Sequence, residues 1–374
     1  MKIFYKNTNN LYPEKFDCIH HNDLDGYSSA CIIADEMGVI ESIPLDRFHK
    51  TNYSQYKTDF ESDTTVFIVD VSFTDNTYDK LLEICTNASK VIWIDHHQSS
   101  VDLFEKHRDV LDGLLEGYLL TENGYSAAYL VYLYFTYTMT KVFNEFDMVN
   151  YDVYLKGYRL SDVETVFDRI RVPLFIKYVS DYDTWTKRLP YCDEFNYGVM
   201  AKVNSVESVI LSSFIAKQSE LYIRKDEKEA IDVIIEAGKN IMEYLKMSNA
   251  KLVKSNAYVI SMRIPRLIKC TFNCIMLNAS GNSLVFGDTL FEPDIDFGIC
   301  YTYNGEEYKY SIYKNPKSDI PINSNDIAEI FGGGGHKGAA GFRLPTRLED
   351  MDSNEANNKF FTIEKISHLK EIKF

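Results

Sequence analysis

The chain has 374 residues, of which 45% are hydrophobic and 25% are charged, so it is long and apolar enough for two or three folded domains. Its 55 acidic and 40 basic side chains give a formal net charge of -15. A surface this acidic disfavours a protein that coats long duplex DNA or an anionic membrane. It does not exclude a small anionic substrate held by metal ions, because bound cations invert the local charge.

The first seven residues lack the apolar run of a signal peptide, and no later stretch approaches the roughly 18 uninterrupted apolar residues of a membrane helix. We therefore expect a cytoplasmic location and no membrane partner. The seven cysteines include no CxxC pair, so the sequence signals neither a zinc ribbon nor a disulfide framework. Reduced core thiols are the expected interpretation.

From Phe16 to about Asp95, short apolar runs alternate with helix-like stretches, which is the rhythm of βαβ units in a parallel sheet. This pattern predicts a helix at Tyr27–Met37 and strands at Phe16–His20, Val66–Val69 and Val91–Ile94. Each strand stops at acids and histidines, namely His21, Asp23 and Asp25, then Asp70, then Asp95, His96 and His97. Because ligands of open α/β sheets bind at the carboxyl ends of the strands, these clusters should converge.

Further along the chain, a helix is predicted at Tyr125–Tyr132 and a charged helical arm at about Ser205–Met247. A second α/β domain follows, with strands at Tyr258–Met262, Ser283–Phe286, Asp296–Tyr303 and Tyr308–Tyr313, a helix at Asn325–Phe331 and a polar loop at Arg347–Asn358. The expected fold is therefore α/β with two domains. We expect a parallel-sheet domain at 1–200, a helical linker at 201–252 and a smaller C-terminal α/β domain at 253–374.

The segment His21–Gly26 follows the first predicted strand. On an extended segment, alternation sends His21, Asp23 and Asp25 to one side, which brings one imidazole and two carboxylates to one point. This oxygen-rich set suits manganese or magnesium. Gly26 permits a tight turn into the next helix, whose N-terminus favours a phosphate. An acidic turn is the alternative interpretation, and this segment alone does not separate the two.

Two more clusters follow the neighbouring strands. Asp70 alone is typical of a helix cap or turn residue, but a carboxylate from a neighbouring strand could bridge two cations. In Asp95–His97 the two histidines point different ways, so one can ligate a metal while the other faces a substrate, and the aspartate can fix an imidazole tautomer. A histidine pair after an acid at a strand end favours a functional role over a structural one.

A fourth candidate lies in the segment Tyr178–Trp185, which contains two aspartates. We choose Asp181, which directly follows an apolar run, over Asp183 as the acid that completes the shell of a second metal. A surface acidic turn is the alternative for either residue.

The last candidate is Phe331–Phe342, in which Gly332, Gly333, Gly334 and Gly335 precede His336 and Lys337. Consecutive glycines expose backbone N–H groups in a concave nest for an anion, and the two side chains that follow add donors. A flexible linker is the alternative, but the flanking residues do not have linker composition. The pattern favours a nucleotide or phosphate grip.

Taken together, these motifs resemble the DHH phosphoesterase superfamily. Asp95-His96-His97 is similar to the motif that names the superfamily, and Gly332–His336 is similar to the GGGGH signature of its C-terminal DHHA1 domain. The motifs extend over nearly the whole chain, from His21 to Phe342. Within the superfamily, His21–Gly26 most resembles the oligoribonuclease branch, the nano-RNases that degrade very short RNA.

The resemblance implies a site for two Mn²⁺ ions, with Mg²⁺ or Co²⁺ as alternatives. It implies that His21 and Asp23 bind one ion, that Asp70 bridges both, and that the other ion is held by Asp25, His96 and Asp181. It further implies that His97 acts on the scissile phosphate or leaving oxygen, that Asp95 orients a histidine, and that Gly332–His336 holds the distal nucleotide. Many relatives carry a phosphate-binding arginine in the stretch that matches Ser311–Lys314, where this chain has no arginine, and Lys314 is expected to substitute for it.

The expected function is a metal-dependent phosphodiesterase that hydrolyses short RNA or DNA oligonucleotides to mononucleotides. A 3′-phosphoadenosine 5′-phosphate phosphatase and a phosphodiesterase for cyclic or linear dinucleotides are the nearest alternatives. An inactive module that sequesters a nucleotide is the alternative from a different class. The sequence leaves the oligomeric state open, a homodimer included.

Overall fold

The structure is a computed structural model that describes residues 2–4, 13–39, 44–51, 55–119, 125–143, 172–201, 227–280, 283–335, 337–351 and 362–368. The chain divides into two compact units, Met1–Ile241 and Met242–Phe374. Within the described ranges, no helix combines the length and the apolar composition that crossing a bilayer requires.

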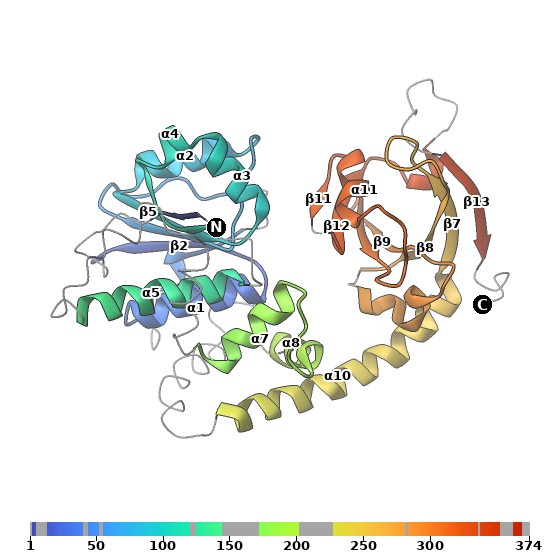
Figure 1. Cartoon of the computed structure of the whole chain (residues 1–374), viewed down its shortest axis with the longest axis horizontal. Helices are drawn as coiled ribbons and strands as arrows, with labels where there is room; N and C mark the ends of the chain where they lie inside the picture. The colour runs from blue at the N-terminus through green and yellow to red at the C-terminus, as the bar shows by residue number, and fades with distance from the viewer. Residues whose placement is uncertain are drawn as a thin grey trace. The chain divides into compact units, whose positions relative to one another are not determined.

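Unit 1 alternates strands and helices along the chain (Figure 1). Its strands are β1 (Lys2–Phe4), β2 (Phe16–His21), β3 (Phe48–Thr51), β4 (Thr65–Val69), β5 (Lys90–Asp95) and β6 (Leu115–Leu119). Its helices are η1 (Leu45–Arg47), α1 (Leu24–Glu36), α2 (Tyr78–Asn87), α3 (Gln98–Lys106), α4 (Arg108–Leu111), α5 (Ala127–Phe143), α7 (Leu174–Asp183) and α8 (Cys192–Met200). The strand and helix predictions for this part of the chain are confirmed, with boundaries shifted by a few residues.

The strands of unit 1 form a six-stranded sheet in the order β1-β6-β5-β4-β2-β3. All neighbouring pairs from β3 to β6 are parallel, and β1 runs antiparallel to β6. The chain places β3 on one side of β2 and β4 on the other, so the order reverses between β2 and β4. Such a switch point opens a crevice at the carboxyl ends of the strands, where α/β proteins bind ligands. The predicted α/β class with a parallel sheet is confirmed.

The strands of this sheet are buried on both faces, because an apolar layer covers each face. Along β4, Phe67 and Val69 join the core shared with α1 and α5, whereas Val66 and Ile68 join the core shared with α2, α3 and α4. Figure 1 shows α1 and α5 on one side of the sheet and α2 to α4 on the other. The side-chain alternation of a strand thus explains why an uninterrupted apolar run forms this element.

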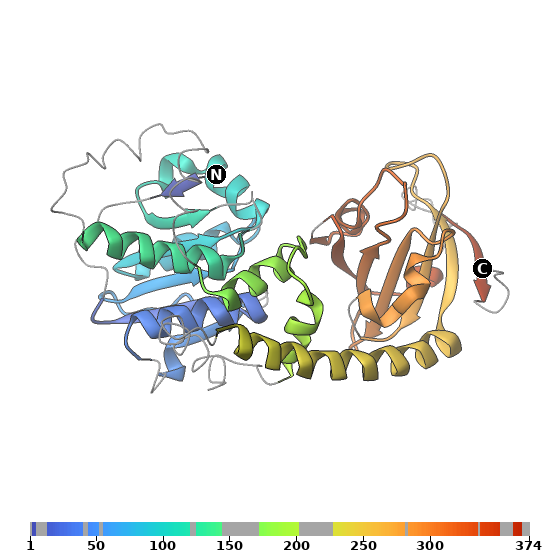
Figure 2. The same ribbon diagram turned by 60° about the horizontal axis from the view of Figure 1, so that its bottom comes forward.

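Helix α10 (Glu227–Asn256) is one continuous helix (Figure 2), of which the first part belongs to unit 1 and the last part to unit 2. Ile231 and Ile235 enter the core of unit 1, while Val253 enters a core of unit 2. This helix contains the described part of the predicted arm, and residues 202–226 lie outside the described residues.

Unit 2 contains a seven-stranded sheet in the order β11-β12-β10-β9-β8-β7-β13, in which only the pair of β8 and β9 is parallel among the described strands. Its elements are β7 (Tyr258–Arg263), β8 (Phe272–Asn278), η3 (Ser283–Phe291), β9 (Phe297–Tyr303), β10 (Tyr308–Lys314), α11 (Ser324–Ile330), β11 (Gly334–Gly335), β12 (Ala339–Leu344), η4 (Leu348–Asp350) and β13 (Thr362–His368). Helix α11 covers one face, and the end of α10 with η3 covers the other.

Three predicted strands of this region correspond to β7, β9 and β10, and the predicted helix corresponds to α11, so these predictions are confirmed. The strand predicted at Ser283–Phe286 is wrong, because these residues begin the helical turns of η3. Val285 and Phe286 are buried, and Gly287 with φ 53° turns the chain. The apolar run therefore covers the sheet instead of joining it. No strand is predicted at β8, β11, β12 or β13.

The tail predicted as a loop, Arg347–Asn358, contains η4 in its described part, and residues 352–361 lie outside the described residues. The seven cysteines are free thiols, and five of them are buried.

Candidate metal centre

Three neighbouring strands of unit 1 end in the polar residues that were singled out in the sequence. His21 is the last residue of β2, Asp70 follows β4, and Asp95, the last residue of β5, precedes His96 and His97. The register pairs β2 with β4 and β4 with β5 in parallel, so these ends lie at one edge of the sheet. The expected convergence is what the structure shows.

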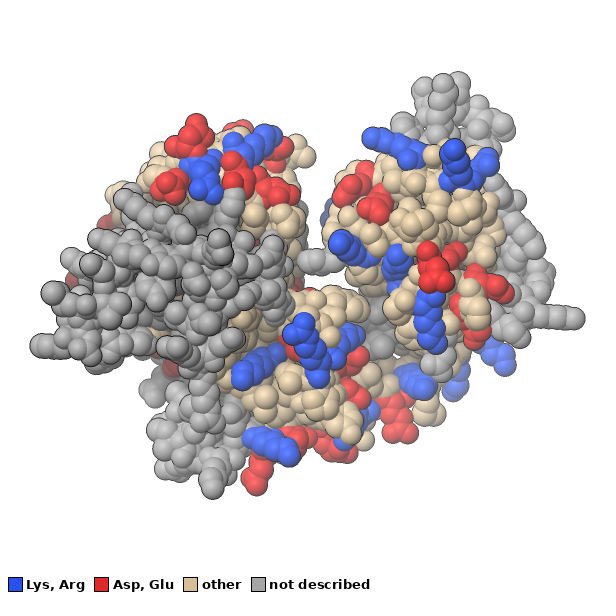
Figure 3. Space-filling model, in the orientation of Figure 1, with Lys and Arg blue, Asp and Glu red and all other residues tan. Residues whose placement is uncertain are grey.

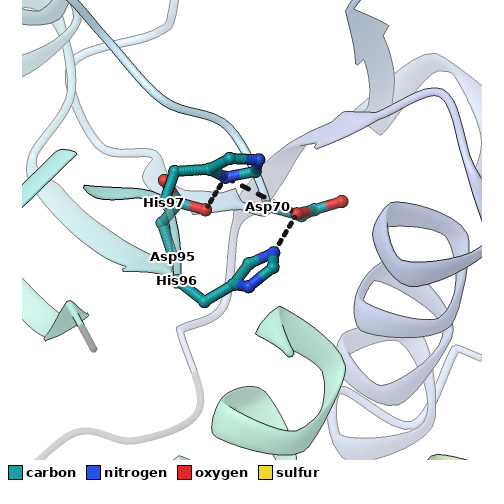
Figure 4. A group of neighbouring side chains, drawn as sticks. All are labelled: Asp70, Asp95, His96 and His97. Atoms are coloured by element: carbon teal, nitrogen blue, oxygen red, sulfur yellow. Dashed lines mark hydrogen bonds and ion pairs between the residues drawn. The ribbon is translucent and has the colours of Figure 1, made fainter. Parts of the chain in front are cut away.

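Asp70 lies in the middle of this group and is only 1% exposed. Its Oδ2 is 3.6 Å from His21 Nδ1. Its Oδ1 is 3.3 Å from His96 Nε2, a contact that Figure 4 shows. The backbone of Asp70 is left-handed, with φ 56°, which directs the chain sharply away from β4. Positive φ is uncommon for residues other than glycine, and aspartate is one of the few that adopt it readily.

Helix α7 adds a carboxylate to the group, because Asp183 at its end has Oδ2 3.1 Å from His96 Nε2. Asp23 adds another, since its Oδ2 is 2.6 Å from His21 Nδ1. These contacts bring together residues that lie as far apart in the sequence as Asp23 and Asp183.

Asp25 joins the group from a helix, and not from an extended segment with alternating side chains as predicted. It lies in the first turn of α1, not on an extended segment, and its Oδ2 is 3.8 Å from His96 Nε2. Its carboxylate also accepts the backbone N–H groups of Ala127 at 2.7 Å and Ala128 at 2.9 Å, at the beginning of α5. Asp25 therefore caps a second helix while it faces the cluster.

The first turn of α1 passes very close to the end of β2. Asp23 caps the helix by accepting the N–H of Gly26 at 2.9 Å. A Cβ at Gly26 would lie 2.3 Å from the backbone oxygen of His21, so only glycine fits. Gly26 thus permits a close approach within the helix rather than the turn that was predicted before it.

Asp95 and His97 form a connected pair beside Asp70. His97 Nδ1 is 2.8 Å from Asp95 Oδ1, and the hydroxyl of Ser100 donates to Asp95 Oδ2 at 2.5 Å. Both carboxylate oxygens of Asp95 are therefore engaged by neighbours, and His97 is held in one orientation. Figure 4 shows the two imidazoles directed to the same side, toward Asp70, so the prediction that the two histidines point different ways is wrong.

Burial and like charges dominate the electrostatics of the carboxylates. Burial raises the pKa of Asp25 well above its usual value, and the nearby carboxylates of Asp70 and Asp183 raise it further. Burial likewise raises the pKa of Asp70 to about 6, with a contribution from Asp23. In Asp95, by contrast, burial is outweighed by the charge of His97, which holds the pKa at about 2. The cluster therefore attracts positive charge strongly.

The histidines respond in the opposite sense. Burial disfavours the charged form of His21, but its hydrogen bond with Asp23 and the nearby carboxylate of Asp70 raise its pKa to about 11. Burial also opposes the charging of His96 and His97, while Asp183 and Asp95, respectively, raise their pKa values. In the absence of a metal, protons on the imidazoles balance part of the carboxylate charge.

The donor atoms fit divalent cations. Three groups, each with its ligand atoms within 4.8 Å of one another, are His21 with Asp23 and Asp70, Asp25 with His96 and Asp183, and Asp70 with Asp95, His96 and His97. Among the described residues, neither Asp70 Oδ2 nor His96 Nε2, both buried, has a hydrogen-bond partner with suitable geometry. Oxygen-rich sets with imidazole suit manganese or magnesium, so the residues fit such ions.

The structure does not bring Asp181, the aspartate chosen from the sequence, into this group. Its Oδ1 accepts the hydroxyl of Thr186 at 2.5 Å and the N–H of Arg188 at 2.8 Å, and its Oδ2 accepts the N–H of Leu189 at 2.8 Å. The segment is the end of helix α7, where side chains two residues apart point about 200° apart. The helical phase therefore directs Asp183 to His96 and Asp181 to the following loop.

The glycine run in unit 2 is more closely packed than an open nest. The N–H groups of Gly332 and Gly333 donate to Glu329 and Ala328 and so end helix α11. A Cβ at Gly333 would lie 2.0 Å from the backbone oxygen of Gly341, which explains the glycine there. Gly334 and Gly335 form β11 and are exposed, as is Lys337, whereas His336 lies outside the described residues.

Lys314 was expected in place of a phosphate-binding arginine. Its Nζ donates to the backbone oxygen of Ile320 at 3.0 Å and to Asn323 Oδ1 at 3.2 Å. These contacts hold the loop that precedes α11, so the lysine has a structural role in the conformation described.

Fold and site together define a two-unit α/β protein with a buried carboxylate–imidazole cluster at the switch point of a parallel sheet. No family model matches the chain. An uncharacterized protein, R106, of Acanthamoeba polyphaga mimivirus is 25% identical over 178 residues, which are 46% of this chain and 37% of that protein. The chain therefore spans little more than a third of the length of this curated relative.

Solved structures of similar chains include enzymes of phosphoester chemistry. A pGpG-specific phosphodiesterase of Vibrio cholerae is 14% identical with a TM-score of 0.40, covering 90% of this chain and 95% of that one. RecJ of Thermus thermophilus, in complex with Mn²⁺, is 13% identical with a TM-score of 0.43, covering 89% and 50%. An exopolyphosphatase-related protein of Bacteroides fragilis is 15% identical with a TM-score of 0.44, covering 90% and 88%. Similarities this low assign no activity, which has to be argued from the residues of this chain.

Proposed function

We propose that the protein is a phosphoesterase of the DHH type, and that it hydrolyses short oligonucleotides to mononucleotides with divalent metal ions. The observation that carries this proposal is the convergence of five carboxylates and three histidines at the carboxyl edge of the parallel sheet. A buried group of this composition is costly unless cations bind it.

For the metals we assign two neighbouring sets that share Asp70. His21 and Asp23 would hold one Mn²⁺ ion, and Asp25, His96 and Asp183 would hold the other. When bound, such ions supply an activated water and neutralise the charge that develops on a phosphoryl group. Asp70 is suited to both sets because its two oxygens face different histidines, His21 and His96.

His97 is assigned to the substrate. Asp95 engages its Nδ1, so Nε2 is the ring atom that we assign to a phosphate oxygen or to the leaving oxygen. The side chain of His97 is 20% exposed, in contrast to 6% for His96, so it is the histidine of the pair that a substrate can reach. Asp95 and Ser100 hold it in place, which is a positioning role.

A substrate panel tests the proposal. Purified protein with Mn²⁺ is incubated with a dinucleotide, a five-nucleotide RNA, a cyclic dinucleotide, 3′-phosphoadenosine 5′-phosphate and pyrophosphate, and the products are identified. We expect mononucleotides from the dinucleotide and the short RNA. Hydrolysis of only the cyclic dinucleotide or the bisphosphate nucleotide would instead identify another phosphoesterase activity, and hydrolysis of pyrophosphate alone would identify a phosphoanhydride hydrolase.

Two substitutions connect the activity to the site. Asp70→Ala and His97→Ala should each lower kcat by at least about 100-fold while circular dichroism shows an intact fold. Full activity in either variant would contradict the assignment. If the wild type leaves every nucleotide intact but is thermally stabilised by one of them, the protein is a nucleotide-binding module and not an enzyme.

A further inference from the structure

The loop that follows helix α7, residues 184–191, exposes a large aromatic side chain two residues after an aspartate of the candidate metal centre. Trp185 is 45% exposed and lies two residues after Asp183, whose carboxylate contacts His96 at 3.1 Å. Two residues of chain span at most about 7 Å, so the loop begins within a nucleotide's length of the cluster.

The loop is fixed rather than free to collapse onto the core. Asp181 accepts hydrogen bonds from Thr186 and from the backbone N–H groups of Arg188 and Leu189, at 2.5 to 2.8 Å. Trp185 has φ 57° and Lys187 has φ 44°, a left-handed conformation that bulky side chains adopt rarely. Backbone strain of this kind costs about 1–3 kcal/mol per residue and persists mainly at functional sites.

Neighbouring side chains hold the indole ring in one orientation. The ring of Tyr182 stacks with it at a centroid distance of 6.5 Å and an interplanar angle of 26°. Lys187 Nζ lies 4.6 Å from its centroid and is itself anchored by Asp193 at 2.7 Å. A preorganised aromatic ring that is almost half exposed is suited to stack on a second planar group.

Basic side chains accompany this ring although the chain as a whole is acidic. Lys177, Lys187 and Arg188 are all exposed, and Figure 3 shows Lys and Arg side chains gathered over α7 and α8. Among the residues that the structure describes, the guanidinium of Arg188 has no ion-pair partner. Aromatic platforms with adjacent cations are the usual means of binding single-stranded nucleic acid without sequence specificity.

We propose that Trp185 is a stacking platform for a nucleobase of the substrate, and that Arg188 faces the phosphate attached to it. The proposal builds on the proposed function and narrows it, because a stacking tryptophan selects substrates that carry an aromatic base next to the scissile bond. Inorganic pyrophosphate and polyphosphate lack such a base.

Matched substrates test the proposal. The kcat/KM of wild type and of Trp185→Ala is measured for a dinucleotide and for the same dinucleotide with one nucleoside replaced by an abasic ribose. We expect the variant to lose about 5- to 150-fold on the dinucleotide, the range of one base–aromatic stack, and little on the abasic substrate. Trp185→Phe should retain most of the activity.

Tyr191→Ala is the matched control, because Tyr191 is 54% exposed, has φ 61° and ends the same loop. This variant should behave as the wild type on both substrates. Equal losses of Trp185→Ala on both substrates, or no loss on either, would overturn the stacking proposal, and so would an equal loss in Tyr191→Ala.

Fluorescence provides a readout that does not depend on turnover. The chain has two tryptophans, and the other one, Trp93, is fully buried. Adenosine 5′-monophosphate should quench the tryptophan emission of the wild type saturably, whereas ribose 5-phosphate should not. The emission of Trp185→Phe should not be quenched by either compound. If the wild type hydrolyses no substrate yet shows this quenching, the proposed activity fails while the stacking site stands. Absence of quenching in an active wild type overturns the stacking site alone.

Discussion

Replacing Asp181 and Asp183 one at a time should separate folding from metal binding. Both lie in the last turn of α7, so the two variants are closely matched in position and chemistry. The carboxylate of Asp181 accepts hydrogen bonds from the next loop, whereas that of Asp183 contacts His96. We expect Asp181→Ala to lose stability and to keep its affinity for metal. We expect Asp183→Ala to keep its stability and to lose affinity for metal.

The magnitudes follow from these contacts. Asp181→Ala leaves two backbone N–H groups and one hydroxyl without their acceptor, and each unsatisfied buried group costs about 1–3 kcal/mol. Because the loop is partly exposed and water can replace some bonds, we expect the free energy of unfolding to fall by about 3 kcal/mol. Asp183→Ala removes one of several mutually repelling carboxylates, and its side chain is 26% exposed, so the change should stay within about 1 kcal/mol.

Urea unfolding followed by circular dichroism, without metal, measures the first quantity. Calorimetric titration with Mn²⁺, under conditions in which both variants are folded, measures the second. Loss of a ligand should weaken the affinity of Asp183→Ala for Mn²⁺ by at least about 10-fold. Normal Mn²⁺ binding by Asp183→Ala, together with weakened binding by a folded Asp181→Ala, would refute the assignment of the helical phase.

Three further predictions concern single side chains of the two units. Asp25→Ala should lower the free energy of unfolding by about 2 kcal/mol even without metal, because two backbone N–H groups at the start of α5 lose their cap; equal stability in urea would contradict this. Gly26→Ala should cost at least about 2 kcal/mol, whereas Gly113→Ala, with its nearest neighbour at 3.7 Å, should be nearly neutral in the same assay. Gly333→Ala should lower the thermal midpoint of unit 2, while Gly334→Ala, which has open space, should leave it unchanged if packing explains the glycine run.

The sequence was sufficient to predict which strand ends meet. Asp70 and Asp95 each follow an apolar run, and the βαβ rhythm makes those runs parallel neighbours, so their ends must lie at one edge of a sheet. The contact between Asp95 and His97 also follows from adjacency. Strand ends are predictable because a parallel sheet leaves little freedom in where they lie.

Helix phase was not predictable in the same way. The choice between Asp181 and Asp183 depends entirely on the direction in which each side chain faces, and that direction follows only once the segment is known to be a helix. The apolar positions of α7, among them Phe175, Ile176 and Val179, fix that phase by packing against the core. The helical spacing of these apolar residues is the sequence signal that identifies Asp183 as the residue facing the cluster.

Unit 2 shows where local patterns fail. The apolar residues Ser283–Phe286 are compatible with a strand or a buried turn, and only Gly287 and the contacts beneath the sheet decide between them. The glycine run likewise has two explanations. A nest needs available N–H groups, but those of Gly332 and Gly333 close α11, so close packing against β12 explains part of this motif.

The net charge of -15 is partly a property of the site and not only of the surface. Five carboxylates and three imidazoles of unit 1 share one largely buried region, so the carboxylates outnumber the imidazoles that could neutralise them by two. Burial raises the pKa values of Asp25 and Asp70, which shows that these carboxylates are poorly solvated without cations. A divalent ion can replace the protons on the histidines and satisfy these carboxylates at once. An acidic chain and a small anionic substrate are therefore compatible, because two divalent ions would offset four of the five carboxylate charges in this region.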